Sequence, residues 1–225
     1  MSLGEKLARV REDLGAAAKR AGRDLSEITL VGVSKTAPRP AIEEAFRLGL
    51  RDFGENRVSV AEEKFTPLPY PPNQASLHLI GHLQTNKARR AVKLFDIIHS
   101  VDDLRLAQSL NRYCAEFGKK MPILIQVNVS GEESKEGLAP VELGTTLEQV
   151  LRLDYLEVRG LMTLAPYTEN PEEVRPVFAR LQTLFEKHHP GTPAWRTLSM
   201  GMTNDFEVAI EEGATIVRVG RAIFQ

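Results

Sequence analysis

ITLVGVSK, residues 28–35, is an apolar run rich in β-branched side chains, and it ends on a serine and a lysine. Such a run is typical of a strand buried on both faces of a parallel sheet. Seven more short apolar runs follow, and all but the last are followed by helical spacing of apolar residues. The predicted strands are residues 28–35, 52–56, 77–81, 96–101, 122–129, 156–164, 197–201 and 214–224.

Eight such units predict an α/β fold, a single (β/α)8 TIM-type barrel, as one domain over residues 1–225. The competing architecture is an open doubly wound sheet. That fold favours a glycine-rich GxGxxG turn after its first strand, which is absent here, as is the P-loop pattern GxxxxGK[ST]. No flexible linker, repeat or low-complexity segment divides the chain.

Composition and charge narrow the classes of protein. Lysine and arginine number 29 against 30 acidic residues, a net charge of −1, so no positive field favours nucleic acid or an acidic membrane. No stretch approaches the roughly 18 apolar residues that a membrane span needs. The single cysteine, Cys114, excludes an intrachain disulfide and fits a reducing cytosol. We expect a cytoplasmic protein without nucleic-acid or membrane partners, as a monomer or a weak dimer.

In a barrel, functional side chains gather where the strands end, and Lys35 follows the first strand. Apolar surroundings would disfavour its charged form and free the amine as a nucleophile. An amine at the mouth of a barrel is suited to forming a Schiff base with an aldehyde or ketone. The alternative interpretation is a solvated lysine at a strand–loop junction.

The end of the chain adds a phosphate-binding pattern. Ser199-Met200-Gly201-Met202-Thr203 and Val219-Gly220-Arg221-Ala222 are short glycine-containing turns, whose exposed backbone N–H groups can hold a phosphate after the seventh and eighth strands. Arg218 lies inside the apolar run TIVRVG and needs a partner or a place at the rim. Barrel closure brings the first and last strands to about 4.8 Å from each other, so Lys35 and Arg218 are expected to share one mouth.

Other candidates carry weaker signals. Asn56 and Arg57 could reach a ligand or begin a helix, and Met162 and Met200, with Met202, could pack on a flat ring or fill the core. His99 is interpreted as a hydrogen-bonded histidine at the end of a strand. A polar run could line the pocket or cap a helix: His82, Gln84, Asn86 and Lys87. His188-His189 shows no pattern of metal ligands, so no metal is expected.

Eight stretches resemble the pyridoxal phosphate homeostasis protein family and follow one another in family order. They are LVGVSKT (30–36), FGENRV (53–58), HLIGHLQTNK (78–87), DIIHSVD (96–102), QVNVSGEESKEG (126–137), VRGLMTL (158–164), LSMGMTNDFEVAIEEGAT (198–215) and VRVGRAIF (217–224).

The resemblance implies a barrel like the N-terminal domain of alanine racemase, with pyridoxal 5′-phosphate (PLP) held as a Schiff base on Lys35. It also implies Asn56 beside the ring, Arg218 at the pyridine nitrogen, and Ser199 with the Gly220 turn around the phosphate. Many relatives carry a hydroxyl residue where this chain has Arg221, whose backbone N–H and guanidinium remain as donors.

The implied function is PLP binding for vitamin B6 homeostasis, with little or no turnover. An arginine disfavours a protonated pyridine ring and so weakens the electron sink of PLP chemistry. The chain also ends with the barrel, whereas full-length racemases carry a second domain with a catalytic tyrosine. Partners would be PLP and PLP-requiring apoenzymes. The alternatives are a PLP-dependent amino-acid racemase and a cofactor-free Schiff-base aldolase.

Overall fold

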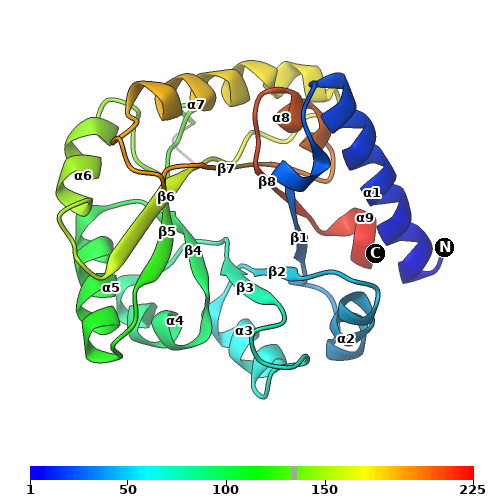
Figure 1. Ribbon diagram of the computed structural model, residues 1–225, viewed down its shortest axis with the longest axis horizontal. Coiled ribbons are helices and arrows are strands. Elements are labelled where there is room, and N and C mark those ends of the chain that lie inside the picture. Colours follow the sequence, from blue (N-terminus) through cyan, green and yellow to red (C-terminus); the bar gives the residue numbers. More distant parts are fainter. Residues whose placement is uncertain (133–135) are drawn as a thin grey trace.

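The computed structural model describes residues 1–132 and 136–225, and its eight parallel strands close into one barrel in chain order, as predicted (Figure 1). Part of the family-like stretch 126–137 therefore lies outside the described residues. The strands are β1 (Thr29–Val33), β2 (Asp52–Glu55), β3 (Ser76–Leu79), β4 (Ile97–Val101), β5 (Met121–Gln126), β6 (Leu156–Met162), β7 (Thr197–Met202) and β8 (Ile216–Val219).

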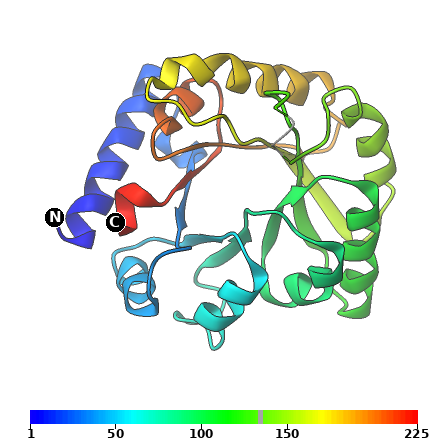
Figure 2. The same cartoon turned by 180° about the vertical axis from the view of Figure 1, so that it is seen from behind.

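Helices form a ring outside the strands, as the view from behind also shows (Figure 2). They are α1 (Leu3–Arg20), α2 (Arg39–Arg47), α3 (Val58–Phe65), α4 (Ala88–Leu94), α5 (Leu104–Glu116), α6 (Leu143–Val150), α7 (Arg175–Lys187), α8 (Phe206–Glu211) and α9 (Arg221–Phe224), with short 3-10 turns at Leu25–Glu27, Thr85–Lys87 and Pro171–Val174. Within the described ranges, no helix is long and apolar enough to cross a membrane.

Local sequence explains several helix ends. Ser2 accepts a hydrogen bond from the Glu5 backbone while the Glu5 side chain accepts one from the Ser2 backbone, and this capping box begins α1. Asp103 caps α5 by accepting from the Leu106 backbone. These caps satisfy backbone donors that have no partner inside the helix.

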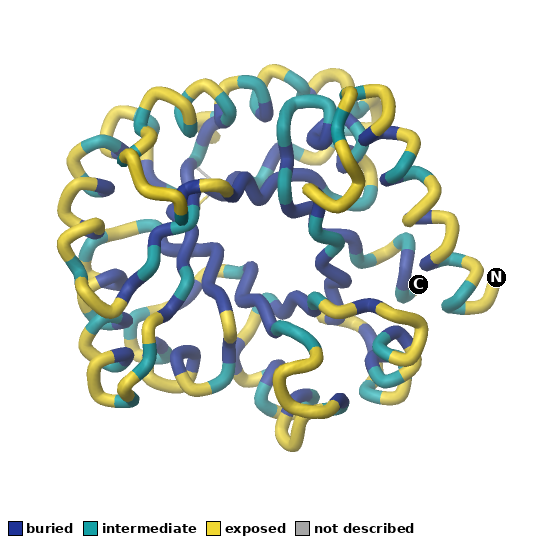
Figure 3. The backbone as a smooth tube through the Cα atoms, in the orientation of Figure 1, coloured by how far each residue is buried: buried dark blue, intermediate teal, exposed yellow. Residues whose placement is uncertain are grey.

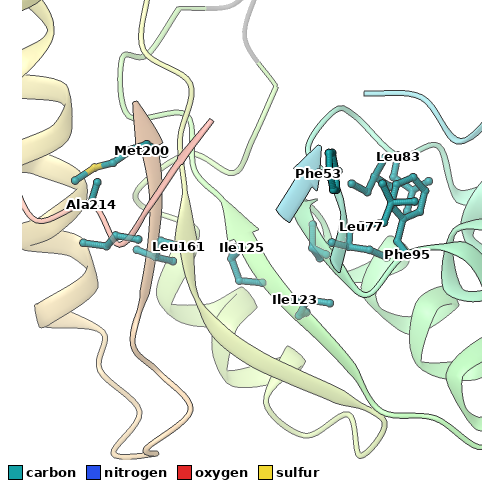
Figure 4. Packing of buried hydrophobic residues seen from close by; sticks show 14 of the residues in the cluster. Phe53, Leu77, Leu83, Phe95, Ile123, Ile125, Leu161, Met200 and Ala214 are labelled. Carbon is teal, nitrogen blue, oxygen red and sulfur yellow. The ribbon is translucent and has the colours of Figure 1, made fainter. Parts of the chain in front are cut away.

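The apolar core lies between the strands and the helices. Burial is concentrated in the strands and on the inner sides of the helices (Figure 3). Phe53, Leu77 and Phe95 lie with Leu83 on one side of the view in Figure 4, and Leu161, Met200 and Ala214 of the same apolar cluster lie on the other. The few polar side chains that the strands bury therefore lie in an interior that is otherwise apolar.

The last predicted strand is wrong in its length. We expected residues 214–224 to be extended, but β8 ends at Val219 and residues Arg221–Phe224 turn into the short helix α9. A helix therefore follows the eighth strand as well. The predicted closure is confirmed, because β1 pairs with β8 in parallel and places Val31 opposite Arg218.

Candidate functional site

A cavity of about 1010 Å³ opens where the carboxyl ends of the strands meet. This is the volume of a site for a small organic ligand. Its lining includes five of the nine predicted cofactor-binding residues: Lys35, Asn56, Arg218, Gly220 and Arg221. Barrel closure therefore brings together residues from both ends of the sequence, and these five share one pocket.

The other four predicted residues do not line this pocket. Met162 and Met200 are fully buried, as in the core-filling alternative, while Met202 lines the cavity instead. Ser199 is also fully buried and bonds to other side chains. Gly201 is buried at φ +88°, where a Cβ would come within 2.6 Å of the Ala209 Cβ. Gly201 therefore allows the close packing of this turn against Ala209 and offers no side chain to the cavity.

Lys35 lies in the loop after β1, at the open mouth of the pocket. The expectation that apolar surroundings desolvate its amine is wrong in this structure, because the residue is exposed. The strand ends at Val33, so Lys35 lies beyond the apolar wall of the barrel. Because Lys35 lines the pocket and is exposed, its side chain is accessible to a ligand there.

The backbone beneath Lys35 is held by a buried ion pair that the sequence patterns did not reveal. The Lys64 ammonium donates to the carbonyl oxygens of Ser34 and Lys35, at 2.7 and 3.0 Å, and to Glu55 Oε1 at 3.2 Å. Glu55 Oε1 also accepts from the Ser34 hydroxyl at 2.7 Å. Three donors on one ammonium thus fix the loop that carries Lys35.

Arg218 is 3 % exposed, and its guanidinium is fixed by two acceptors. Nη1 donates to Ser199 Oγ at 2.5 Å, and Nη2 donates to the Thr163 carbonyl at 2.8 Å. Burial lowers the pKa of Arg218 to about 10, and the charge of Asp205 opposes that shift. The side chain therefore stays cationic at neutral pH and presents a rigid fork to the pocket.

Polar groups from the loops after β7 and β8 form one corner of the pocket. The Gly220 backbone N–H faces Thr203 Oγ1 at 3.4 Å, and Arg221 Nη2 donates to Asn204 Oδ1 at 3.1 Å. Asp205 Oδ1 accepts from the Met202 backbone at 2.5 Å and tightens the turn. Thr203 is the last residue of the predicted phosphate-binding turn, whereas Asn204, which follows it, is not among the predicted site residues.

The opposite wall comes from the loops after β2 and β3. Asn56 and Arg57 line it, with His82, Gln84 and Lys87 of the predicted polar run, whereas Asn86 does not. The His82 Nδ1 lies 3.3 Å from an Asp102 oxygen. Burial raises the pKa of Asp102, and His82 opposes that shift. In the described part of the chain, no group of His, Cys, Asp and Glu side chains could hold a metal ion.

Gly81 lets two of these loops touch. A Cβ at this position would lie 2.4 Å from the carbonyl oxygen of Asn56 and 2.8 Å from its Cα. We expect Gly81→Ala to push Asn56 out of place and to weaken binding of PLP, the ligand that the resemblance implies, by about tenfold or more, which is the cost of one lost hydrogen bond. Isothermal calorimetry with PLP measures the effect.

Gly15→Ala is the control for that substitution. Gly15 lies in α1, and a Cβ there would have only Leu25 within 4.0 Å. We expect its affinity for PLP to equal that of the wild type. Equal affinity in Gly81→Ala and wild-type protein would show that the contact with Asn56 does not shape the site.

Comparison with known proteins shows that the chain belongs to the class of alanine racemase N-terminal domains. The family described as "Alanine racemase, N-terminal domain" matches residues 6–225. An alanine racemase of Clostridium difficile 630 superposes with a TM-score of 0.70 over 96 % of this chain and 55 % of its own, at 14 % identity, which shows the shared fold.

Within this class the chain belongs to the pyridoxal phosphate homeostasis protein family. It is 43 % identical over 225 residues to the pyridoxal phosphate homeostasis protein of Aquifex aeolicus, covering all of this chain and 98 % of that protein. The Pseudomonas aeruginosa protein of that name is 42 % identical, covering 99 % of this chain and 95 % of its own. PipY of Synechococcus elongatus PCC7942 with PLP bound has a TM-score of 0.86 and 36 % identity, with complete coverage of both chains.

Proposed function

We propose that this protein binds PLP in the cavity at the carboxyl ends of the strands and serves PLP homeostasis. The observation that carries the proposal is the meeting of Lys35 with Arg218 and the polar corner in one pocket. The name of the Aquifex aeolicus relative and the PLP-bound PipY structure support the choice of ligand. A cytoplasmic location, in which the buried Cys114 stays reduced, is part of the proposal.

The donor set fits PLP in three places. The accessible Lys35 amine matches an aldehyde, and we infer that it holds PLP through a Schiff base. The hydroxyl of Thr203, the carboxamide of Asn204 and the guanidinium of Arg221 match a phosphate. Arg218 would face the ring nitrogen with a hydrogen-bond donor, and Asn56 would lie beside the ring.

PLP, when bound, supplies an aldehyde that condenses with amines and a ring that withdraws electrons. The protein's own residues support retention better than turnover. A guanidinium that stays cationic at neutral pH cannot accept a proton, so Arg218 disfavours a protonated ring nitrogen. We therefore propose a carrier that stores PLP and releases it to PLP-requiring apoenzymes, acting as a monomer or a weak dimer.

The test is the absorption spectrum of the purified protein before and after addition of PLP. We expect a visible band in the wild type and its loss in Lys35→Ala, because this substitution removes the amine that would form the Schiff base. Lys87→Ala is the matched control, since Lys87 lines the same pocket, and its band is expected to remain. A protein that never takes up PLP, or a Lys35→Ala variant with an unchanged band, would overturn the proposal.

Two further readouts separate the alternatives. Borohydride reduction followed by peptide mass spectrometry is expected to add the mass of reduced PLP to the peptide that contains Lys35. Addition of a sugar-phosphate fragment there would instead indicate an aldolase. Solvent deuterium entering the Cα position of an amino acid, and lost in Lys35→Ala, would indicate a racemase.

A further inference from the structure

A line of hydrogen bonds crosses the interior of the barrel and ends on Arg218. Asp52 Oδ1 lies 3.0 Å from His78 Nε2, and His78 Nδ1 lies 3.0 Å from His99 Nε2. His99 Nδ1 lies 2.9 Å from Ser199 Oγ, which accepts from Arg218 Nη1 at 2.5 Å. These five residues, Asp52, His78, His99, Ser199 and Arg218, are called the axial network below.

The axial network runs through the barrel rather than along its wall. His99 belongs to β4 and Ser199 to β7, which are not neighbours in the sheet, so their hydrogen bond must span the interior. Its far end, Asp52, lines a second cavity of about 670 Å³ together with His78. Thr29, Thr197 and Ile216, the first residues of β1, β7 and β8, line that same cavity, so it lies at the opposite mouth.

The two ends of the axial network impose one direction on its hydrogen bonds. Arginine can only donate and an ionised carboxylate can only accept. Ser199 therefore accepts from Arg218, and its own hydrogen needs an acceptor, which His99 Nδ1 supplies. A neutral His99 then donates from Nε2 to His78 Nδ1, and a neutral His78 donates from Nε2 to Asp52.

The surroundings of His99 favour a neutral imidazole at that position. His99 is fully buried, and burial, with His78 and the cation of Arg218 nearby, holds its pKa well below the usual value. His78 is 4 % exposed. A neutral imidazole has one donor and one acceptor nitrogen, which is what each position in this line requires.

We propose that Asp52, His78 and His99 are positioning residues that act through Ser199 to orient Arg218 in the pocket, with both imidazoles neutral and protonated on Nε2. If His99 did not accept the Ser199 hydrogen, the hydroxyl could turn that hydrogen toward the guanidinium and lose its attraction for it. The accepting nitrogen keeps a lone pair of Ser199 facing Arg218. The positioning of the arginine for a cofactor rests on the proposed function.

The first test uses protein without PLP. Nitrogen-15 NMR of labelled histidines at neutral pH is expected to show His78 and His99 as neutral Nε2–H tautomers. Assignment comes from the loss of each signal in His78→Gln and His99→Gln. An Nδ1–H tautomer at His99, or an imidazolium at His78, would reverse part of the line and overturn the proposal.

The second test measures coupling to the pocket. His99→Phe and Ser199→Ala are each expected to weaken PLP binding by about tenfold, the cost of one hydrogen bond to a charged group. The double variant is expected to lose no more than either single variant, because both break the same line. Additive losses would mean two independent structural effects and would overturn the proposal.

Controls separate positioning from folding. Asp96→Asn changes a carboxylate at the same far mouth, but Asp96 accepts from the Leu77 backbone and lies outside the axial network. Its PLP affinity and absorption spectrum are expected to match the wild type, whereas Asp52→Asn is expected to weaken binding. Asp52→Asn gives this end of the axial network an NH2 group that can donate to His78 Nε2, so the direction of the line is no longer fixed. It replaces His99→Phe if that variant does not fold, and equal affinity in the two Asn variants would overturn the proposal.

The outcomes distinguish this inference from the proposed function. A wild type that takes up no PLP defeats the proposed function, while the tautomers still decide the direction of the axial network. A wild type that binds PLP, with the wrong tautomers or unchanged affinity in His99→Phe, defeats the inference alone.

Discussion

Lys64→Met is expected to destabilise the protein by about 3–5 kcal/mol, because it leaves a buried carboxylate without its cation. Glu55 is fully buried, and its Oε2 has no hydrogen-bond partner among the described residues. Without Lys64, the Ser34 hydroxyl would be the one side-chain donor to Glu55 left in the described part of the chain. Urea denaturation monitored by circular dichroism measures the loss in the free energy of unfolding.

Two controls isolate the charge as the cause. Adding Glu55→Gln to Lys64→Met removes the unpaired charge and is expected to recover much of the lost stability. Arg90→Met breaks an ion pair between Arg90 and Glu62, which is on α3 like Lys64 but more exposed, and is expected to cost far less. A double variant as unstable as Lys64→Met would contradict this explanation.

Gly160→Ala is expected to cost more than about 3 kcal/mol, a value typical of a severe steric clash in a packed core. Gly160 has φ +150° and lies opposite Thr197, where β6 pairs with β7. A Cβ there would lie 1.9 Å from the Thr197 carbonyl oxygen, so the two strands would have to separate. The free energy of unfolding in urea measures the effect.

Gly191→Ala is the matched control, because it keeps the backbone strain and removes the clash. Gly191 has φ +76°, and a Cβ there would meet nothing within 4 Å. We expect a loss of about 1–2 kcal/mol, the cost of a left-handed conformation for a residue with a Cβ. Similar losses at the two glycines would show that the contact with Thr197 is not the cause.

The strand pattern was largely readable from the sequence. Apolar runs such as ITLVGVSK and DIIHSV predict buried parallel strands, and the number of these runs implies a closed barrel. The short helix at Arg221–Phe224 was missed, because the apolar run from residue 214 to 224 carries no signal of its end except Gly220.

Two histidines share with Arg218 the feature of a polar side chain inside an apolar strand. A polar side chain inside a buried strand needs a partner, and His78 in LHLI and His99 in IIHS meet that description as well as the arginine does. His99 does lie hydrogen-bonded, although in the middle of β4 rather than at its end. The pattern could not name its partner, since Ser199 is 100 residues away.

By itself the sequence determined the barrel, the placing of Lys35 and Arg218 at one mouth, and the family. The barrel and the shared mouth follow from short-range patterns and from the rule that parallel strands end on the same side, and the family follows from the resemblance of eight stretches. Tertiary structure alone decided that the Lys35 side chain is exposed, that Lys64 and Glu55 hold its loop, and that the axial network reaches Arg218. Each of these depends on distances between side chains on different elements, which no local pattern encodes.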